Sequence, residues 1–135
     1  MEMTMLLAAA KTAMMRAYAP YSGFFVGAAL LCGDGTVITG CNIENATYGA
    51  TNCAARTALF QAVSQGRRDF RAMAIVGGQQ GEIRDFCPPC GICRQVMAEF
   101  CPGDFRVILT NGAGEIRQMT LDELLPWQFS AASME

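Results

Sequence analysis

Apolar residues recur at helical spacing in the first part of the chain and then gather in short runs. Between Thr4 and Tyr18 the apolar positions 6, 7, 10, 13, 14 and 17 predict an amphipathic helix. Pro20 disfavours helical geometry in the residue before it, so we expect the helix to end there. A Gly-Asp-Gly turn at 33–35 separates two apolar runs and predicts a hairpin with strands at 25–31 and 36–40.

The rest of the chain alternates predicted helices and strands. The expected helices lie at 53–64, with Asn52 as the cap and Gly66 past the end, at 90–100, and after a capping box at 120–123. The expected strands lie at 70–76, 105–109 and 115–119, the first of them closed by Gly77-Gly78, and the expected loops lie at 41–51 and 79–89. This order predicts one layered α/β domain over 1–135, with helices packed on a mixed sheet.

Composition narrows the classes of partner. Apolar residues make up 52% of the chain and charged residues 16%, so we expect part of the apolar surface to contact other subunits. The net charge of −2 and the lack of a basic run argue against a polynucleotide partner and favour a small-molecule substrate. No apolar run is long enough for a membrane span, and the acidic Glu2 does not fit a signal peptide, so we expect a cytoplasmic protein.

The cysteines carry the candidate chemistry. There are seven of them and no histidine, so a metal site in this chain must use thiolates and carboxylates. An odd number of cysteines in a reducing compartment favours metal binding or catalysis over disulfides.

Cys53 and the downstream segment Pro89-Cys90-Gly91-Ile92-Cys93 form the most informative spacing. A C-x-x-C unit binds one metal ion from the start of a helix, and a remote third thiolate completes a catalytic zinc site with one open position. The positive ends of the two predicted helices lower thiol pKa values there. Arg56 and Arg94 are close enough in sequence to offset the negative charge of three thiolates.

The other cysteines have different interpretations. Cys32, Cys41 and Cys101 lie at predicted strands or helix ends without a partner motif, which favours a structural role. Cys87-Pro-Pro-Cys90 is itself a C-x-x-C, so Cys87 could be the fourth ligand of a closed structural site. A redox pair is the remaining alternative, and the two prolines and the remote Cys53 fit a metal better.

The chain resembles the small homotetrameric cytidine deaminases over nearly its whole length. The matching segments are Ala19-Pro-Tyr-Ser22, Phe24-Phe-Val-Gly-Ala-Ala29, Gly40-Cys-Asn-Ile-Glu-Asn45, Cys53-Ala-Ala-Arg-Thr-Ala-Leu-Phe60, Pro89-Cys-Gly-Ile-Cys-Arg-Gln95 and Leu124-Leu-Pro126. The resemblance implies a three-layer fold with a mixed sheet of about five strands and helices on both faces. It also implies a homotetramer whose active sites are shared between subunits, and hydrolytic deamination of cytidine or 2′-deoxycytidine in pyrimidine salvage by a zinc-activated water.

The resemblance also implies a role for each matching residue. One Zn²⁺ per subunit would be bound by Cys53, Cys90 and Cys93, while Arg56 would donate hydrogen bonds to the ligand sulfurs. The implied substrate contacts are Asn42 and Glu44 to the ribose hydroxyls, Phe24 to the face of the pyrimidine, the Ala54 backbone to the base, and Tyr48 and Phe129 reaching a neighbouring subunit's pocket.

One position departs from the family pattern. The family has Cys-Ala-Glu-Arg where this chain has Cys-Ala-Ala-Arg at 53–56, so Ala55 occupies the place of the proton-shuttling glutamate. A methyl group cannot move protons, and Glu44, Glu82 and Asp85 offer no good replacement. We therefore predict an almost or wholly inactive chain that still binds zinc and nucleoside.

The origin of Ala55 and the function of the chain each have alternatives. Our hypothesis is a deliberate Glu→Ala replacement in an otherwise intact site, because Ala is what an experimenter chooses to silence a Glu. The alternatives are a natural non-catalytic zinc-containing nucleoside-binding module and a deaminase of another cytosine-containing small molecule.

Overall fold

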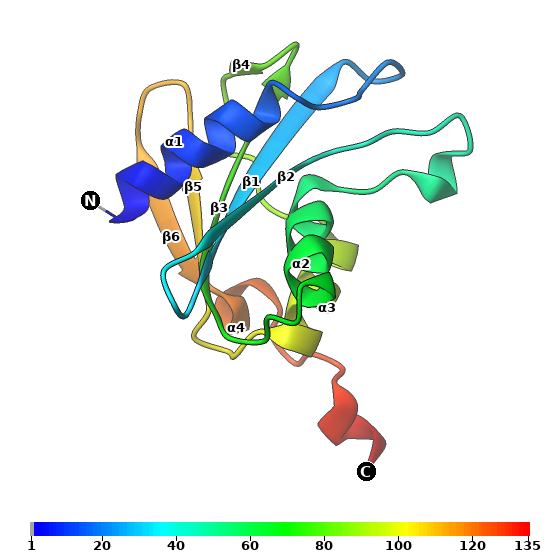
Figure 1. The fold of residues 1–135 in the computed structure, drawn as a ribbon, viewed down its shortest axis with the longest axis vertical. Helices are drawn as coiled ribbons and strands as arrows, with labels where there is room; N and C mark the ends of the chain where they lie inside the picture. Colours follow the sequence, from blue (N-terminus) through cyan, green and yellow to red (C-terminus); the bar gives the residue numbers. More distant parts are fainter. Residues whose placement is uncertain (1) are drawn as a thin grey trace.

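One mixed sheet runs through the computed structural model, which describes residues 2–135 (Figure 1). Its strands are β1 (Phe24–Cys32), β2 (Val37–Cys41), β3 (Phe70–Gln79), β4 (Glu82–Ile83), β5 (Arg106–Thr110) and β6 (Ile116–Thr120). The order is β2-β1-β3-β5-β6, and β4 pairs with β3 at its end. The pair β3–β5 is parallel and the other pairs are antiparallel, so the predicted mixed sheet is confirmed.

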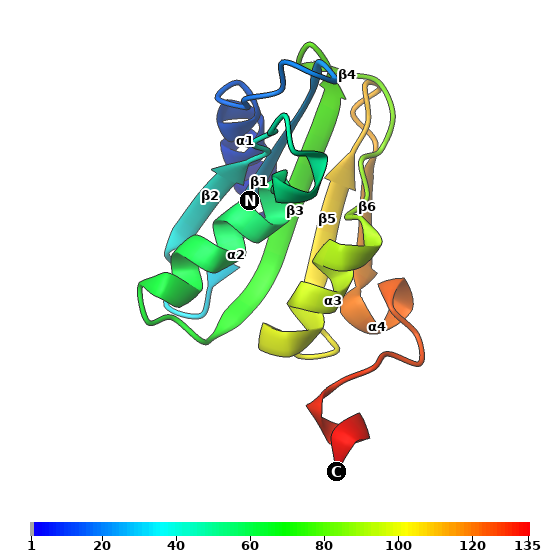
Figure 2. The same ribbon diagram turned by 90° about the vertical axis from the view of Figure 1, so that its right-hand side faces the viewer.

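Helices cover both faces of this sheet, which confirms the expected three layers. Helix α1 (Glu2–Met14) packs on one face, and α2 (Ala54–Ser64) and α3 (Gly91–Phe100) pack on the other. Figure 2 shows α2 and α3 side by side in front of the sheet, with α1 behind it. Side chains of β1 alternate between the two cores: Ala28 and Leu30 face α2 and α3, and Ala29 and Leu31 face α1.

The first helix is shorter than predicted. It ends at Met14, and the chain then turns so that Tyr18 pairs with the segment beyond β2. The Tyr18 amide donates to the Asn42 carbonyl, and the Tyr18 carbonyl accepts from the Glu44 amide. These two bonds require an extended backbone at Tyr18, which overrides the helical spacing of the preceding apolar residues.

The predicted cap of α2 is wrong. Cys53 is the N-cap residue, and its side chain makes no capping hydrogen bond. Asn52 instead pairs through its backbone with Ile43, and its side-chain amide donates to the Thr57 hydroxyl. Sequence pattern alone does not show that this amide is already engaged by a side chain one turn into the helix.

The expected loop at 79–89 contains the additional strand. Gly77 and Gly78 continue β3 instead of closing it. A Cβ at Gly78 would lie 1.9 Å from the Glu82 carbonyl oxygen of β4, so glycine at this position allows β4 to pair with β3. Gln80 and Gly81 both have positive φ angles, 53° and 82°, as a tight hairpin turn requires. Likewise the loop at 41–51 contains one 3-10 turn, Tyr48–Ala50.

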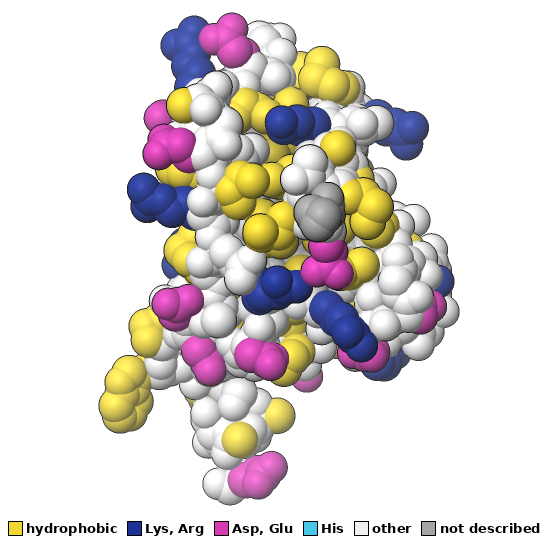
Figure 3. All heavy atoms as spheres, turned by 90° about the vertical axis from the view of Figure 1, so that its left-hand side faces the viewer, with side chains coloured by type: hydrophobic (Ala, Val, Ile, Leu, Met, Phe, Trp, Pro, Cys, Tyr) yellow, Lys and Arg dark blue, Asp and Glu magenta, His cyan; other side chains and the backbone are white. Residues whose placement is uncertain are grey.

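The C-terminal part begins as predicted. The capping box of Thr120 and Glu123 is present and starts the short helix α4 (Leu121–Leu124). Beyond it, the chain extends away from the sheet to a last 3-10 turn at Ala131–Met134 (Figure 1). On the face in Figure 3, apolar side chains group in the upper half, and basic and acidic side chains are interspersed. No helix within residues 2–135 is long and apolar enough to cross a membrane.

Helix α2 lies close against the sheet at Gly40 of β2. A Cβ at this position would lie 2.6 Å from the Ala58 nitrogen and 2.8 Å from the Ala54 carbonyl oxygen. We expect Gly40→Ala to lower the free energy of unfolding by about 3 kcal/mol or more, because backbone atoms must move apart to admit the methyl group. Denaturant unfolding followed by circular dichroism measures the change.

Gly49→Ala is the matched control, because a Cβ there meets nothing within 4 Å. Equal stability of the two variants would contradict the close packing of α2 on β2.

Candidate active site

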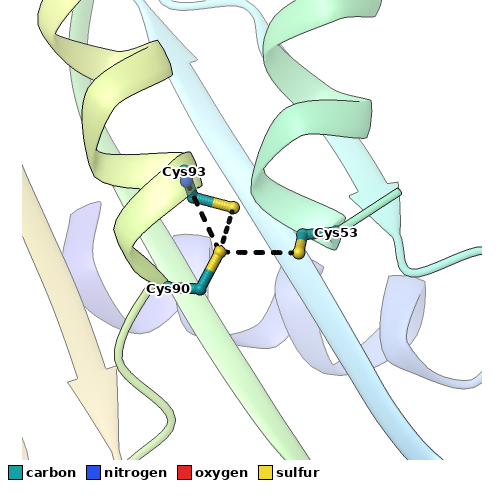
Figure 4. A group of neighbouring side chains, drawn as sticks. All are labelled: Cys53, Cys90 and Cys93. Atoms are coloured by element: carbon teal, nitrogen blue, oxygen red, sulfur yellow. Dashed lines mark hydrogen bonds between the residues drawn. The ribbon is translucent and has the colours of Figure 1, made fainter. Parts of the chain in front are cut away.

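Three cysteine sulfurs meet between the first turns of α2 and α3 (Figure 4). Cys53 immediately precedes α2, Cys90 immediately precedes α3, and Cys93 lies in the first turn of α3. The Sγ atoms of Cys90 and Cys93 are 3.3 Å apart, and those of Cys53 and Cys90 are 3.7 Å apart. All three lie within 4.8 Å of one another. The structure thus brings together the three cysteines that the spacing indicated.

This group has the dimensions of a zinc site. Tetrahedral zinc with Zn–S bonds of about 2.3 Å places its sulfur ligands roughly 3.8 Å apart. The Cys90–Cys93 and Cys53–Cys90 sulfur separations, 3.3 and 3.7 Å, lie slightly below that distance. Thiolates are also a preferred donor type for zinc. Three sulfurs leave one tetrahedral position for a water molecule or substrate, as in catalytic sites.

The local geometry follows from how the two helices begin. Cys90 has an extended backbone, and its Sγ accepts a hydrogen bond of 3.4 Å from the Cys93 amide. The sulfur therefore caps its own helix, a role that is ordinarily filled by Ser, Asp or Asn. Cys53 has the same extended conformation at the start of α2. Both helix N-termini consequently place their positive ends beside the sulfurs.

Arg56 provides the neighbouring positive charge. Its guanidinium donates to the Cys53 Sγ at 3.2 Å. Its Nε is buried and has no hydrogen-bond partner among residues 2–135. Arg94, the other expected source of charge, donates instead to the backbone carbonyls of Pro89 and Leu124. Charge compensation at the sulfurs therefore comes from Arg56.

The pKa of Cys53 is lowered by its neighbours. Hydrogen bonds from the Cys93 thiol, from Arg56 and from the Cys90 thiol lower the pKa of Cys53 to about 5, and they outweigh the opposing effect of burial. The pKa of Cys93 is raised, because its thiol donates to Cys53 and is buried. In the metal-free protein the first negative charge thus resides on Cys53, where Arg56 stabilises it.

The other cysteines stand apart from this group. Cys87 is not one of the three clustered thiols, and burial together with the charge of Cys53 raises its pKa to about 11. Its place outside the cluster of three thiols does not favour its interpretation as a fourth ligand. Burial also raises the pKa values of Cys32, Cys41 and Cys101, and no cysteine in residues 2–135 forms a disulfide.

Position 55 follows Cys53 by two residues in the sequence. Ala55 is in the first turn of α2 and is only 4% exposed. Over the described range, the clustered ligand atoms include no carboxylate. Glu82 is paired with Arg84 at 2.7 Å on the surface, and Glu44 is held by Ser22. Each of these acids is engaged with another side chain or the backbone.

The residues expected at the ribose are bound to the backbone of the chain. The Asn42 amide donates to the Phe24 carbonyl at 2.8 Å and accepts from the Val26 amide at 2.9 Å, which fixes the start of β1. The Glu44 carboxylate accepts from the amides of Tyr21 and Ser22 and from the Ser22 hydroxyl. These hydrogen bonds lower the pKa of Glu44.

A cavity of about 360 Å³ adjoins Glu44, and it is lined by Tyr21, Ser22, Glu44, Asn45, Tyr48 and Thr51. Tyr21 and Tyr48 meet edge to face with ring centroids 6.0 Å apart. Sequence reasoning missed the lining role of Tyr21 and Ser22. Their position in Ala-Pro-Tyr-Ser, a segment matching the family, was the available signal.

Three aromatic side chains predicted to contact substrate are accessible. Phe24, Tyr48 and Phe129 are 40%, 75% and 62% exposed. The 3-10 turn with Tyr48 and the segment after α4 lie toward opposite ends of the molecule in both ribbon views (Figures 1 and 2). The cavity that Tyr48 lines does not include Phe129 among its lining residues. Ala54, expected to contact the base through its backbone, is buried beside Cys53.

Fold and site together define an α/β protein with a candidate metal site, in which three thiols come from two adjacent helix starts. A sequence profile described as "Cytidine and deoxycytidylate deaminase zinc-binding region" matches residues 2–109. The chain is 55% identical over 134 residues to a cytidine deaminase of Halalkalibacterium halodurans, covering 99% of this chain and 98% of the relative. It is 53% identical over 130 residues to one from Sporosarcina psychrophila, covering 96% and 93%.

A solved structure agrees with these relatives. The crystal structure of cytidine deaminase from Burkholderia pseudomallei superposes with a TM-score of 0.87 at 50% identity, covering 93% of this chain and 98% of that one. The chain belongs to the cytidine and deoxycytidylate deaminase family.

The low pKa of Cys53 is measurable in metal-free protein. We expect its alkylation by iodoacetamide to fall as pH drops through about 5, where the thiolate is protonated, and to be near its plateau at pH 7. Arg56→Met should move this transition to higher pH by about one unit or more, since a positive charge beside a thiolate favours the charged form. Peptide mass mapping of the labelled cysteine gives the rate at each pH.

Arg71→Met, at an exposed arginine on β3, is the control and should leave the profile unchanged. A profile centred near the ordinary thiol pKa in the parent chain would contradict the charge distribution described for this site.

Proposed function

We propose that this site is built for the hydrolytic deamination of cytidine and 2′-deoxycytidine to the uridine nucleosides, in pyrimidine salvage. The single observation that carries the proposal is the group of three sulfurs, all within 4.8 Å of one another, beside Arg56. Water replaces the exocyclic amine: a C4–O bond forms, the C4–N bond breaks, and ammonia leaves. Membership in a family whose shared region is zinc-binding supports this reaction class.

Cys53, Cys90 and Cys93 would bind one Zn²⁺ per subunit. When bound, zinc supplies Lewis acidity and lowers the pKa of a coordinated water. The hydrogen bond from Arg56 withdraws negative charge from Cys53, which keeps three thiolates from quenching that acidity. The structure of the first turns therefore supports both ligand placement and charge balance.

Substrate would lie between the cluster of three cysteine sulfurs and the cavity beside Glu44. Phe24, at the start of β1 and partly exposed, would pack on the pyrimidine, and the Ala54 backbone would contact the base. Asn42 and Glu44 would accept from the ribose hydroxyls. Glu44 remains ionised because its hydrogen bonds lower its pKa, which suits it as an acceptor.

Position 55 would decide whether bound substrate reacts. The reaction needs a group that takes a proton from water and delivers protons to N3 and to the leaving amine. Ala55 has no ionisable atom, and the carboxylates of Glu44 and Glu82 are engaged elsewhere. We propose that the chain binds zinc and nucleoside with little or no turnover, and that Ala55 replaces a glutamate by design.

We also propose that the domain, residues 1–135, works as a cytoplasmic homotetramer. Phe129 is not among the residues that line the cavity with Tyr48, so we propose that a neighbouring subunit supplies it. Large apolar side chains, including Trp127, are exposed and available for such contacts. The net charge of −2 and the lack of a basic run fit a nucleoside substrate better than a nucleic acid.

Restoring a carboxylate at position 55 tests the catalytic assignment. We expect Ala55→Glu to raise cytidine turnover about 10²-fold to 10⁴-fold above the parent chain, because a positioned acid/base contributes that much. The ultraviolet absorbance change on conversion of cytidine to uridine gives the rate.

Ala55→Gln is the control, since it has nearly the same size and cannot transfer protons as a carboxylate does. The catalytic assignment is refuted if Ala55→Glu binds zinc stoichiometrically and remains as inert as Ala55→Gln.

The ligand assignment has an independent test that uses Co²⁺ as a coloured substitute for zinc. We expect Cys90→Ser to weaken Co²⁺ binding by at least about tenfold and to change its thiolate-to-metal absorption, since hydroxyl oxygen is a poor replacement for thiolate. Cys87→Ser should keep the parent spectrum and a stoichiometry of one metal per chain, because Cys87 lies outside the cluster of three cysteine sulfurs. Matching losses in both variants would favour a four-cysteine site.

A further inference from the structure

Two side chains of α3 bind the C-terminal segment. The Arg94 Nη1 donates to the Leu124 carbonyl at 2.8 Å, and the Gln95 Nε2 donates to the Phe129 carbonyl at 2.7 Å. Both residues directly follow Cys93. Given the proposed zinc site, on which this inference rests, we propose that Arg94 and Gln95 are positioning residues that link metal binding to the placement of residues 125–135.

The cysteines and these contacts share one helical turn. The Cys93 amide donates to the Cys90 Sγ, and the Arg94 amide donates to the Cys90 carbonyl at 3.0 Å. In addition, the Arg94 Nε donates to the Pro89 carbonyl at 2.9 Å, just before Cys90. A change in the separation of the two sulfurs therefore alters the turn from which Arg94 and Gln95 extend.

Arg94 makes this connection in a way that few side chains can. Its planar guanidinium presents donors in fixed directions, so one half-buried group joins Pro89 before α3 to Leu124 at the end of α4. These two carbonyls belong to segments that are far apart in sequence. The loop that delivers Cys90 and the start of the C-terminal segment consequently move together.

The segment beyond Leu124 depends strongly on such contacts. None of residues 125–135 is buried. Besides the Gln95 bond at Phe129, a side-chain contact of 3.5 Å joins Gln128 to Asp122. Trp127 is fully exposed and has a φ of 53°, a conformation that L-residues rarely adopt. A segment with so few buried contacts changes position for a small change in free energy.

In this inference, metal binding would restrain the turn that carries Cys90 and Cys93. The Cys90 and Cys93 sulfurs are 3.3 Å apart and the Cys53 and Cys90 sulfurs 3.7 Å apart, and hydrogen bonds are the interactions that join them. With metal, the sulfurs are fixed at ligand distances and the first turn of α3 is restrained. Because linkage is reciprocal, loss of the contact with the C-terminal segment must also weaken metal binding.

The link has a consequence for a shared active site. Phe129 is the residue proposed to enter a neighbouring pocket, and its backbone is the atom group that Gln95 binds. Metal occupancy in one subunit would thus determine how well that subunit completes the site of its neighbour. A metal-free subunit would impair its partner as well as itself.

Trp127 offers a direct readout, because it is the single tryptophan of the chain and lies between the two anchored carbonyls. Metal-free full-length protein is titrated with Zn²⁺ while the Trp127 fluorescence anisotropy is recorded, and Co²⁺ affinity is measured in parallel by absorption. We compare the parent chain with Gln95→Met, which keeps the side-chain length and removes the donor. Gln61→Met is the matched control, since Gln61 is also an exposed helical glutamine and its side chain has no hydrogen bond within the described residues.

We expect one equivalent of Zn²⁺ to raise the anisotropy in the parent chain and in Gln61→Met. In Gln95→Met we expect this rise to fall at least about twofold and Co²⁺ to bind about fivefold more weakly, the lower end of ordinary coupling between sites. Arg94→Lys, which keeps the charge but cannot bridge two carbonyls, should change both quantities in the same direction.

The outcomes separate this inference from the proposed function. If Co²⁺ gives no thiolate absorption in the parent chain, the proposed zinc site is refuted, and the link that rests on it is refuted too. If metal binds and the Trp127 anisotropy does not respond, or Gln95→Met behaves like Gln61→Met, the link is overturned and the zinc site stands.

Discussion

The convergence of three sulfurs between two helix starts is the constraint on which the rest of the site depends. Sulfurs can approach within 4.8 Å of one another only if α2 and α3 begin at the same level on the same face of the sheet. Gly40 allows α2 to lie against β2 at backbone contact, and the Cys90 sulfur caps α3 where the helix must start. Arg56 then supplies the charge that makes three thiolates tolerable together. Packing therefore sets the geometry, and electrostatics decides which thiol is ionised first.

Much of this arrangement was predictable, because it is encoded in local patterns. The order of helices and strands, the mixed sheet and the capping box at Thr120 follow from periodicity and turn chemistry, and all were confirmed. The grouping of the cysteines followed from a C-x-x-C at one helix start and a cysteine at another. Contacts between distant segments were not predictable. The pairing of Tyr18 with Ile43 shortened the first helix, and the approach of β4 to Gly78 turned an expected loop into a strand.

Ala55 separates two properties that a deaminase site normally combines. Binding of metal depends on sulfur positions and on Arg56, and none of these requires a carboxylate at position 55. In the proposed mechanism, proton transfer would depend on that position. The alanine is also compatible with the fold, because it is a good helix former in the buried first turn of α2. An intact scaffold with an absent proton carrier is consequently stable, and it would retain substrate.

The residues proposed for ribose recognition also determine the shape of the site, which limits how they can be changed. Asn42 holds the backbone on both sides of Phe25 at the start of β1, and Glu44 holds the turn at Tyr21 and Ser22. Both side chains therefore fix the segment that carries Phe24 before any ligand is present. Substituting either one would alter the hydrogen bonds to the sugar and the position of the aromatic ring together. Such preorganisation lowers the entropic cost of binding, because the polar groups and the ring are already in place.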